Sequence, residues 1–201
     1  MASSWEELAT DTLGSANATI DSGSFTAKKY LRVAIYGNAS TGAGDVGLQF
    51  NGNSEAVYGR NYQTNNGTNG SNHSSTSINN CAGGEGGRDP FFSDFTIINI
   101  LDSQKLVVGN LIFEESGNGA EYVPSRRVWS GKWYKVDQQI TSVQLITTED
   151  TFDAGSSITV WGADDAPLVY PNLPNGSVFI TSDSNEHFMW NSSAETWHEV
   201  A

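Results

Sequence analysis

The sequence predicts an all-β fold, a jelly-roll-like antiparallel β-sandwich followed by a small C-terminal β-arm. Short segments in which apolar and polar residues alternate recur along the chain, and this period of two is that of a half-buried strand. Gly, Asn, Asp and Ser separate these segments, as they do in β-turns. No window carries a long apolar stripe at helical spacing. Strands joined by turns are therefore expected throughout.

The first half of the chain contains three strand candidates. Residues 5–13 are expected to open the fold as a strand, although residues 4–8 would also suit the start of a short helix. Residues 30–36 alternate most clearly, with Leu, Val and Ile on one side. Residues 46–50 alternate next and end at Asn51-Gly52, a dipeptide that tolerates the positive φ of a tight turn.

Further strand candidates follow. Residues 94–101 are almost continuously apolar, which is typical of a strand covered on both faces. The remaining candidates are bounded by turn residues and comprise residues 105–113, 127–133, 140–147 and 156–161. The total of about eight strands is the number that builds a sandwich or a jelly roll.

A polar segment, residues 52–90, separates these two groups of strands. Its core at residues 63–87 is of low complexity. Loops longer than about 12–15 residues are uncommon in compact domains and tend to be functional or disordered. We therefore expect a long loop here, held in place by a neighbouring subunit.

Three parts are expected along the chain: a β-sandwich domain at residues 1–165, a proline-punctuated linker at 166–174 and a β-appendage at 175–201. The appendage should contain three short strands, at residues 177–181, 187–190 and 196–200. A three-stranded unit of about 25 residues is too small to be stable alone. We expect it to dock onto the sandwich or onto a neighbouring molecule.

Composition disfavours several functional classes. The net charge is −13, from 23 acidic and 10 basic residues, and phosphate contacts need concentrated positive charge, so no nucleic-acid partner is expected. No segment approaches the roughly 20 apolar residues of a membrane span, and no export signal is recognised. The single Cys81 cannot form a disulfide within the chain.

No catalytic centre is expected. Residues 42–47 have the glycine spacing of a dinucleotide-binding loop, but a strand follows them where that motif needs a helix. The acidic pairs at 114–115, 149–150 and 164–165 are adjacent residues, which face opposite sides of a strand, whereas a glycosidase needs two carboxylates in one cleft. No serine lies in a Gly-x-Ser-x-Gly elbow. We predict no enzyme activity and no cofactor.

No metal site is expected either. His73, His187 and His198 are few and scattered, and they lack a Cys or carboxylate partner at ligand spacing. His187 and His198 could approach each other across adjacent strands of the appendage. The oxygens of residues 183–186 are explained by an Asx-type turn, because the glycine of a calcium loop is missing.

The aromatic residues, six Trp and seven Tyr, offer core packing, a protein interface or a sugar-stacking surface. Core packing is expected for most of them. The candidate interface residues are Trp190 and Trp197 in the appendage, and Tyr122 with the nearby Arg126 in the main domain.

Several stretches resemble one group of proteins. They are Trp5-Glu6-Glu7-Leu8, residues 29–33, 46–53, 140–145 and 152–162, and in the C-terminal part residues 173–179, 181–183, 189–191 and Thr196-Trp197. The first set, over most of residues 5–163, is similar to small β-sandwich structural proteins of tailed bacteriophages. The second resembles a short β-unit found in phage tail and head appendage proteins.

The resemblance implies a non-enzymatic virion protein, assembled in the host cytoplasm, with no catalytic residues to carry over. A capsid decoration or cement protein is favoured, because the heptads or collagen-like repeats of a fibre shaft are missing. Its expected partners are the major capsid protein or other virion proteins and further copies of itself, in a trimer. The alternative is a tail fibre or receptor-binding protein that binds a host surface glycan.

Overall fold

The computed structural model describes residues 4–38, 46–64, 69–79, 90–114, 124–147, 151–165, 175–180, 187–191 and 196–200. Within these ranges the chain is all-β, as predicted, with strands β1 to β15. Two compact units are present, Ala2–Asp165 and Ala166–Ala201. The described residues include no helix long and apolar enough to span a membrane.

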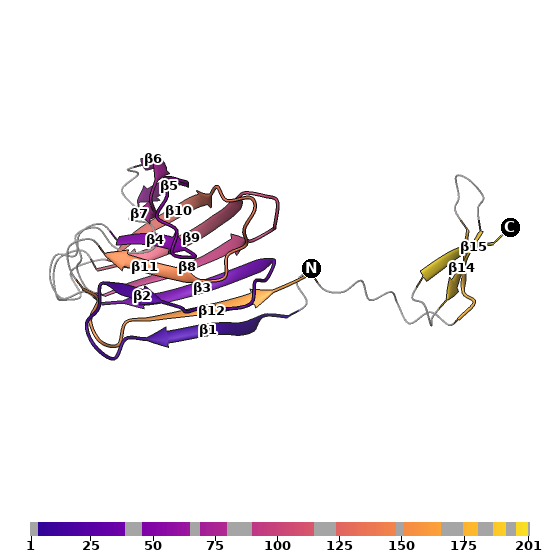
Figure 1. The fold of residues 1–201 in the computed structure, drawn as a ribbon, viewed down its shortest axis with the longest axis horizontal. Coiled ribbons are helices and arrows are strands. Elements are labelled where there is room, and N and C mark those ends of the chain that lie inside the picture. Colours follow the sequence, from indigo (N-terminus) through magenta and orange to yellow (C-terminus); the bar gives the residue numbers. More distant parts are fainter. Residues whose placement is uncertain are drawn as a thin grey trace. The chain divides into compact units, whose positions relative to one another are not determined.

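The first unit contains two antiparallel sheets (Figure 1). The large sheet has eight strands, in the order β1 (Glu6–Thr12), β12 (Ser157–Ala163), β3 (Tyr30–Gly37), β8 (Phe91–Ile98), β9 (Lys105–Phe113), β10 (Ser125–Trp133), β5 (Tyr58–Thr64) and β6 (Asn69–Ser75). The small sheet has four, in the order β2 (Thr19–Asp21), β11 (Val143–Thr147), β4 (Val46–Phe50) and β7 (Ile78–Asn79). Together they form a β-sandwich.

The chain passes repeatedly between the two sheets. Strands β1, β12, β3 and β8 are neighbours in the large sheet. The small sheet consists of the strand next to each of them in sequence: β2 after β1, β11 before β12, β4 after β3 and β7 before β8. The hairpins β5–β6 and β9–β10 extend the large sheet beyond this set. The jelly-roll topology stays a prediction, and this alternation between two sheets favours it.

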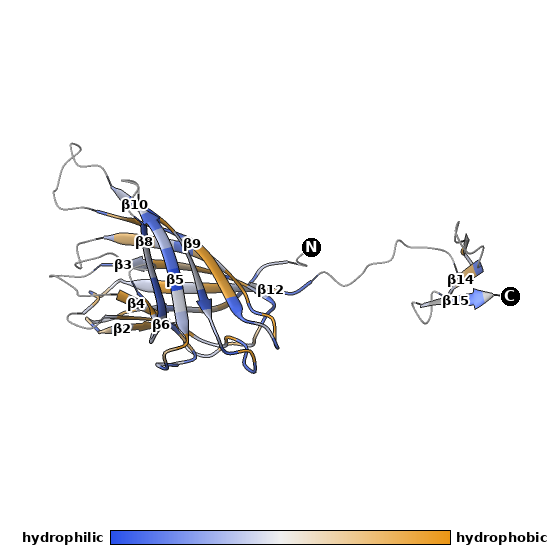
Figure 2. Cartoon of the chain, turned by 90° about the horizontal axis from the view of Figure 1, so that it is seen from above, coloured by the Kyte–Doolittle hydropathy of each residue, from blue (hydrophilic) through white to orange (hydrophobic). Residues whose placement is uncertain are grey.

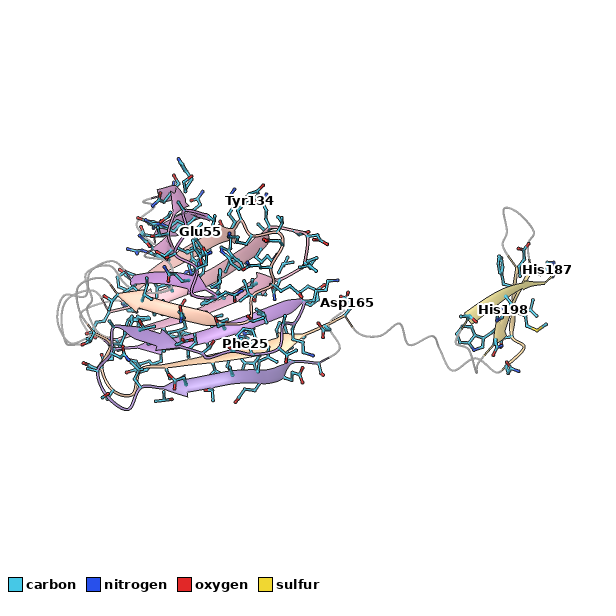
Figure 3. All side chains as sticks on the ribbon, in the orientation of Figure 1. Phe25, Glu55, Tyr134, Asp165, His187 and His198 are labelled. Atoms are coloured by element: carbon cyan, nitrogen blue, oxygen red, sulfur yellow. The ribbon has the colours of Figure 1, made fainter. Side chains whose placement is uncertain are left out.

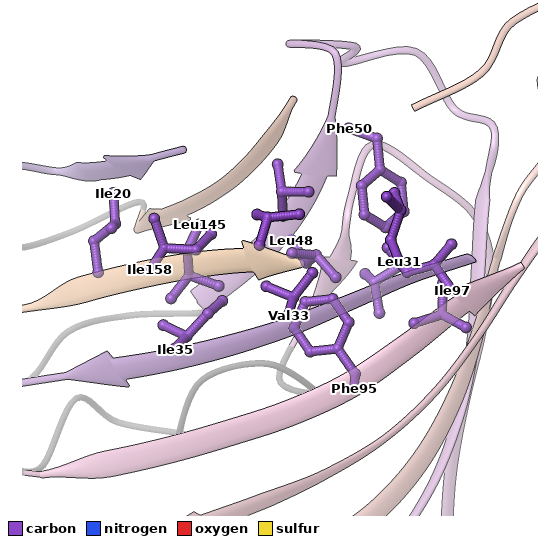
Figure 4. Packing of buried hydrophobic residues seen from close by; sticks show 14 of the residues in the cluster. Ile20, Leu31, Val33, Ile35, Leu48, Phe50, Phe95, Ile97, Leu145 and Ile158 are labelled. Carbon is purple, nitrogen blue, oxygen red and sulfur yellow. The ribbon is translucent and has the colours of Figure 1, made fainter. Parts of the chain in front are cut away.

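The core lies between the sheets and comes from the alternating positions of their strands. In β3, Leu31, Val33 and Ile35 are fully buried, as the sequence predicts, while the residues between them are not. Leu48 and Leu145 face them from the small sheet (Figure 4). Each such side chain stabilises the fold by about 1.5–3 kcal/mol through its removal from water.

The predicted tight turn follows β4. Asn51 and Gly52 have φ values of 55° and 62°, as a type I′ turn requires. The Asn51 side chain also accepts hydrogen bonds from the backbone N–H groups of Thr141, at 2.8 Å, and Ser142, at 3.1 Å. One residue thus ends β4 and fixes the segment that leads into β11.

Two expectations about strands are wrong. The segment 94–101 is not covered on both faces: β8 ends at Ile98, and Ile98, Ile100 and Leu101 are 41%, 38% and 48% exposed. The segment 52–90 is not one long loop, because β5, β6 and β7 form within it, although residues 80–89 lie outside the described part. β5 and β6 extend the large sheet through backbone pairing, and their side chains are mostly polar. The sequence of this segment therefore has no alternating apolar pattern from which the strands could be predicted.

The end of β12 is held by two lysines. Lys28 contacts Glu6 at 2.7 Å and Asp164 at 3.1 Å, and Lys29 pairs with Asp165. The pKa of the Asp164 carboxyl is lowered, first by the hydrogen bond that it accepts from the Lys29 backbone and then by Lys28. These contacts fasten the chain at the last residues of the first unit.

The second unit contains the three predicted strands, β13 (Val178–Ile180), β14 (His187–Asn191) and β15 (Thr196–Val200), paired in that order. Gly176, with a φ of 87°, precedes β13, and its backbone N–H donates to the Trp190 carbonyl at 2.9 Å. Docking of this unit onto a partner stays a prediction.

Candidate functional site: the outer face of the large sheet

The outer face of the large sheet carries the main surface feature of the first unit. An antiparallel sheet with one solvated face normally alternates apolar residues inside with polar residues outside. On β9 three of the four outward positions are apolar instead, and β8 and β10 add exposed apolar residues beside them (Figure 2). We call five of these residues the apolar patch: Ile98, Leu106, Val108, Ile112 and Val128, which are 40–59% exposed.

Strand register makes the apolar patch continuous. Ile98 is the cross-strand partner of Leu106, and Val108 and Ile112 occupy the next outward positions of β9 on either side of Asn110. Asn110 faces Val128 of β10. Contiguous exposed apolar surface of this kind marks interaction sites, whereas single exposed apolar residues are ordinary.

The sequence-predicted Arg126 lies at the margin of this patch. It is exposed on β10 and is the cross-strand partner of Ile112. Its neighbour in the prediction, Tyr122, lies outside the described residues. Whether the two share an interface stays a prediction.

The other two predicted residues pair in the second unit. Trp190 of β14 is the cross-strand partner of Trp197 of β15. Trp190 is only 5% exposed, so in this structure its ring is not a free anchor. The Trp197 side chain lies outside what the structure describes. The structure therefore brings Trp190 and Trp197 together and leaves Arg126 in a different unit.

A hollow of about 360 Å³ lies on strands β12, β3 and β8 of the same outer face. We call it the aromatic shelf, and its lining residues are Trp5, Arg32, Ala34, Phe92, Asp94 and Trp161. Trp5, just before β1, and Phe92 are each 47% exposed, and Trp161 is half-buried. Ala34, the cross-strand partner of Asp94, has a small side chain that keeps the hollow open.

A charged pair lies within the aromatic shelf. Arg32 donates from Nε to Asp94 Oδ1 at 3.2 Å and from Nη2 to Asp94 Oδ2 at 2.7 Å. The hydrogen bond to Asp94 raises the pKa of the Arg32 guanidinium further above its usual value. Both side chains are partly exposed, so the pair contributes little to stability, and its donors and acceptors stay open to a ligand.

Rows of cross-strand partners fix the order of these groups. Trp161 and Arg32 share one row, Ala34 and Asp94 the next, and Tyr36 and Phe92 the one after. An aromatic ring therefore lies on each side of the row that holds Asp94. Sequence reasoning missed the Arg32–Asp94 pair, because 62 residues separate the two in the chain.

Two further hollows flank this region. One, of about 370 Å³, is apolar and is lined by Tyr36, Pro90, Phe92, Ile112 and Pro124 among others. The other lies over Gly59 and is lined by Asn61, His73, Leu106, Ser130 and Lys132 among others. The whole outer face thus offers binding surface rather than a single deep cleft.

The sequence-based arguments about chemistry can be followed in the structure. Gly47 lies within strand β4, so no helix begins there to hold a pyrophosphate. His187 and His198 occupy diagonal positions on β14 and β15, and His198 Nε2 lies 3.1 Å from Thr196 Oγ1 (Figure 3). Within the described ranges no three His, Cys, Asp or Glu residues group as metal ligands would.

Comparisons with protein-family models, with curated proteins and with solved structures find no match to this chain. The functional proposal therefore rests on the apolar patch and the aromatic shelf.

Proposed function

We propose that this chain is a non-enzymatic structural protein of a bacteriophage particle, a capsid decoration protein that attaches through the apolar patch. The observation behind this proposal is that the five residues of the apolar patch, three of them on β9, point outward and are 40–59% exposed. An antiparallel sheet gains nothing from such residues in water, whereas a partner surface that covers them removes apolar area from solvent.

The fold and the charge support this proposal. Double-sheet jelly rolls, the topology that the sequence predicts for this sandwich, occur in viral capsid and lectin domains. Fold alone does not assign function, so the proposal depends on the residues at the surface. A net charge of −13 favours solubility and discourages indiscriminate association, so binding is left to specific surfaces such as the apolar patch.

The partners that we propose are the major capsid protein and further copies of this chain, in a trimer. The second unit would clasp a neighbour by adding its strands to an exposed sheet edge, with Trp190 and Trp197 as anchors. Because Trp190 is buried in this structure, such a clasp would have to rearrange the unit.

Counting the protein on intact particles tests the location. An antibody raised against the purified chain would be used to label phage particles from its source, with the copy number measured by quantitative blotting. Hundreds of copies per particle would support capsid decoration. A few to tens would place the protein in the tail, and particles without the protein would overturn the proposal.

A substitution in the apolar patch tests the attachment surface. Val108, the most exposed patch residue, would be changed to Glu, which should abolish binding to particles that lack the protein while the melting temperature stays the same. Ser54→Glu adds the same charge at an exposed position outside the patch and serves as the control. Equal binding by both variants would contradict attachment through this face.

A second candidate is a tail fibre or receptor-binding protein that recognises a host glycan. The aromatic shelf favours it, because exposed aromatic rings beside a polar pair suit sugar rings. Low copy number on the particle and inhibition of host adsorption by the purified chain would support this candidate over decoration.

A further inference from the structure

We propose that the aromatic shelf is a binding site for a neutral glycan segment. It would be held between the rings of Trp5, Trp161 and Phe92 and hydrogen-bonded by the Arg32–Asp94 pair. This inference goes beyond the attachment role and does not depend on it. Phe92 and Asp94 border the apolar patch across β8 and β9, but the other shelf residues lie on β3, on β12 and just before β1. The two proposals can fail separately. If the protein is found on particles but binds no glycan, only the glycan site is overturned. If it binds glycan but is absent from particles, only the attachment role is overturned.

The aromatic rings provide the first part of the argument. Trp5 and Phe92 are each 47% exposed although the unit has a well-formed core, and both line one hollow together with the half-buried Trp161. Pyranose rings present flat C–H faces, which stack on aromatic side chains. Trp and Tyr offer large rigid contact area at a low cost in conformational entropy, which is why binding surfaces use them.

The Arg32–Asp94 pair provides the second part. A fixed guanidinium–carboxylate fork offers donors and acceptors side by side, and this matches the paired hydroxyls of a sugar ring. The two strands β3 and β8 hold the pair in place through regular cross-strand register. A purely apolar partner would remove water from the Arg32 guanidinium and the Asp94 carboxylate without replacing its hydrogen bonds, which costs free energy. A polyhydroxylated ligand would replace them, so the shelf suits such a ligand.

Charge selects the class of glycan. The pair is neutral as a unit, and Glu7, the cross-strand partner of Trp161, adds negative charge nearby. A chain of net charge −13 repels sulfated or carboxylated polymers. The favoured ligand is therefore an uncharged polysaccharide or oligosaccharide.

The glycan would be bound and not cleaved. Asp94 is the one carboxylate that lines the shelf, and Glu7, the cross-strand partner of Trp161, lies on β1, three strand spacings from β8. At about 4.8 Å per spacing the two backbones are about 14 Å apart. Glycosidases need two carboxyl groups about 5–9.5 Å apart, whereas the lining of the shelf has one carboxylate, Asp94, which is paired with Arg32. The same span suits a ligand longer than one sugar ring.

Affinity electrophoresis of the full chain in gels that contain defined polysaccharides would test the site. The probes are dextran, a linear β-1,3-glucan, galactomannan and the neutral surface polysaccharide of the host, with heparin as the anionic comparison. We expect retardation by at least one neutral polymer and none by heparin. If none of the neutral polymers retards the chain, or if heparin binds best, the inference is overturned.

Substitutions then locate the site. Trp5→Ala and Arg32→Ala should each weaken the retarding interaction by about tenfold or more, equivalent to about 1.4 kcal/mol. Tyr134→Ala removes a 56% exposed aromatic ring elsewhere on the unit and should bind like the unchanged chain (Figure 3). Because Trp5 and Arg32 are exposed, the variants should keep their melting temperatures, which circular dichroism would check. Unchanged retardation of both variants would refute the assignment.

Discussion

At the residue scale, buried polar side chains hold the sandwich in register, and Tyr58 is the clearest of them. It is 1% exposed, and its hydroxyl accepts a hydrogen bond from the Phe50 N–H at 3.0 Å and donates to the Asn53 carbonyl at 2.9 Å. Its ring stacks on Trp133 with centroids 6.4 Å apart. Removal from water raises the pKa of the Tyr58 hydroxyl to about 12.

This shift predicts a pH effect on stability. Between pH 10 and about 12 the unfolded chain loses the Tyr58 proton while the folded chain keeps it. The folded state then binds more protons, so the free energy of unfolding falls as pH rises through this window, by up to about 2–3 kcal/mol. Below pH 10 the group has no such effect. Urea unfolding from pH 9 to 11.5 would measure the fall.

The variant Tyr58→Phe isolates this effect from other titrating groups. It should lose about 1 kcal/mol of stability at pH 7, because its hydrogen bonds are gone. Its difference from the unchanged protein should then shrink above pH 10. A constant difference across the whole range would contradict the prediction.

Lys105 is a fully buried cation in the same unit. Its Nζ donates to the carbonyl oxygens of Ser103 and Lys135, both at 2.8 Å. Burial lowers the pKa of the Lys105 ammonium, and Asp137 and Asp102 partly offset this. The side chain therefore ties the turn after β8 to the segment after β10.

Replacing Lys105 by Met should destabilise the protein. The methionine fills similar volume but leaves the two carbonyl groups without their donor, at a cost of about 1–3 kcal/mol. Lys132→Met, at an exposed position on β10, should change the free energy of unfolding by less than about 0.5 kcal/mol. Denaturant unfolding of both variants at pH 7 would measure these changes, and equal stabilities would contradict the role of Lys105.

At the scale of single strands, close packing of the inner face depends on missing side chains. A Cβ atom added at Gly109 of β9 would lie 2.5 Å from Phe95 Cβ and 2.9 Å from the Trp129 ring. Phe95 and Trp129 already contact each other, with ring centroids 5.3 Å apart. Strand β9 therefore has glycine where two aromatic residues from its neighbours meet.

Gly109→Ala should destabilise the sandwich by about 1–3 kcal/mol, because the added methyl group forces both rings and their strands to shift. Gly14→Ala is a matched control, since a Cβ there meets no atom within 4 Å. Thermal unfolding followed by circular dichroism would compare the two variants. A melting temperature for Gly109→Ala equal to that of the control would show that the core accommodates the methyl group.

Strands with an apolar period were predictable from sequence. Residues 105–113 coincide with β9, and β3, β4 and β12 lie within two residues of their predicted bounds. β5 and β6 were missed because their side chains are mainly polar and cross-strand pairing holds them in the sheet. The Arg32–Asp94 pair was missed for a related reason: it exists only once β3 and β8 adopt their register.

At the scale of the whole molecule, the two units differ in how they achieve stability. All residues of the buried apolar cluster lie between Ile20 and Val160, within the first unit. The second unit has three short strands, and among its described side chains only Trp190 is buried as an apolar residue. The first unit should therefore fold without the second, whereas the second needs a partner.

Truncation after Asp165 tests this division and the proposed clasp together. Because the cluster is complete and Lys28 and Lys29 fasten Asp164 and Asp165, the truncated chain should unfold cooperatively at the same temperature as the full chain. If the second unit clasps a neighbour, truncation should also weaken attachment to particles, measured by co-sedimentation. A clearly lower melting temperature would mean instead that the second unit docks onto its own sandwich, and unchanged attachment would contradict the clasp.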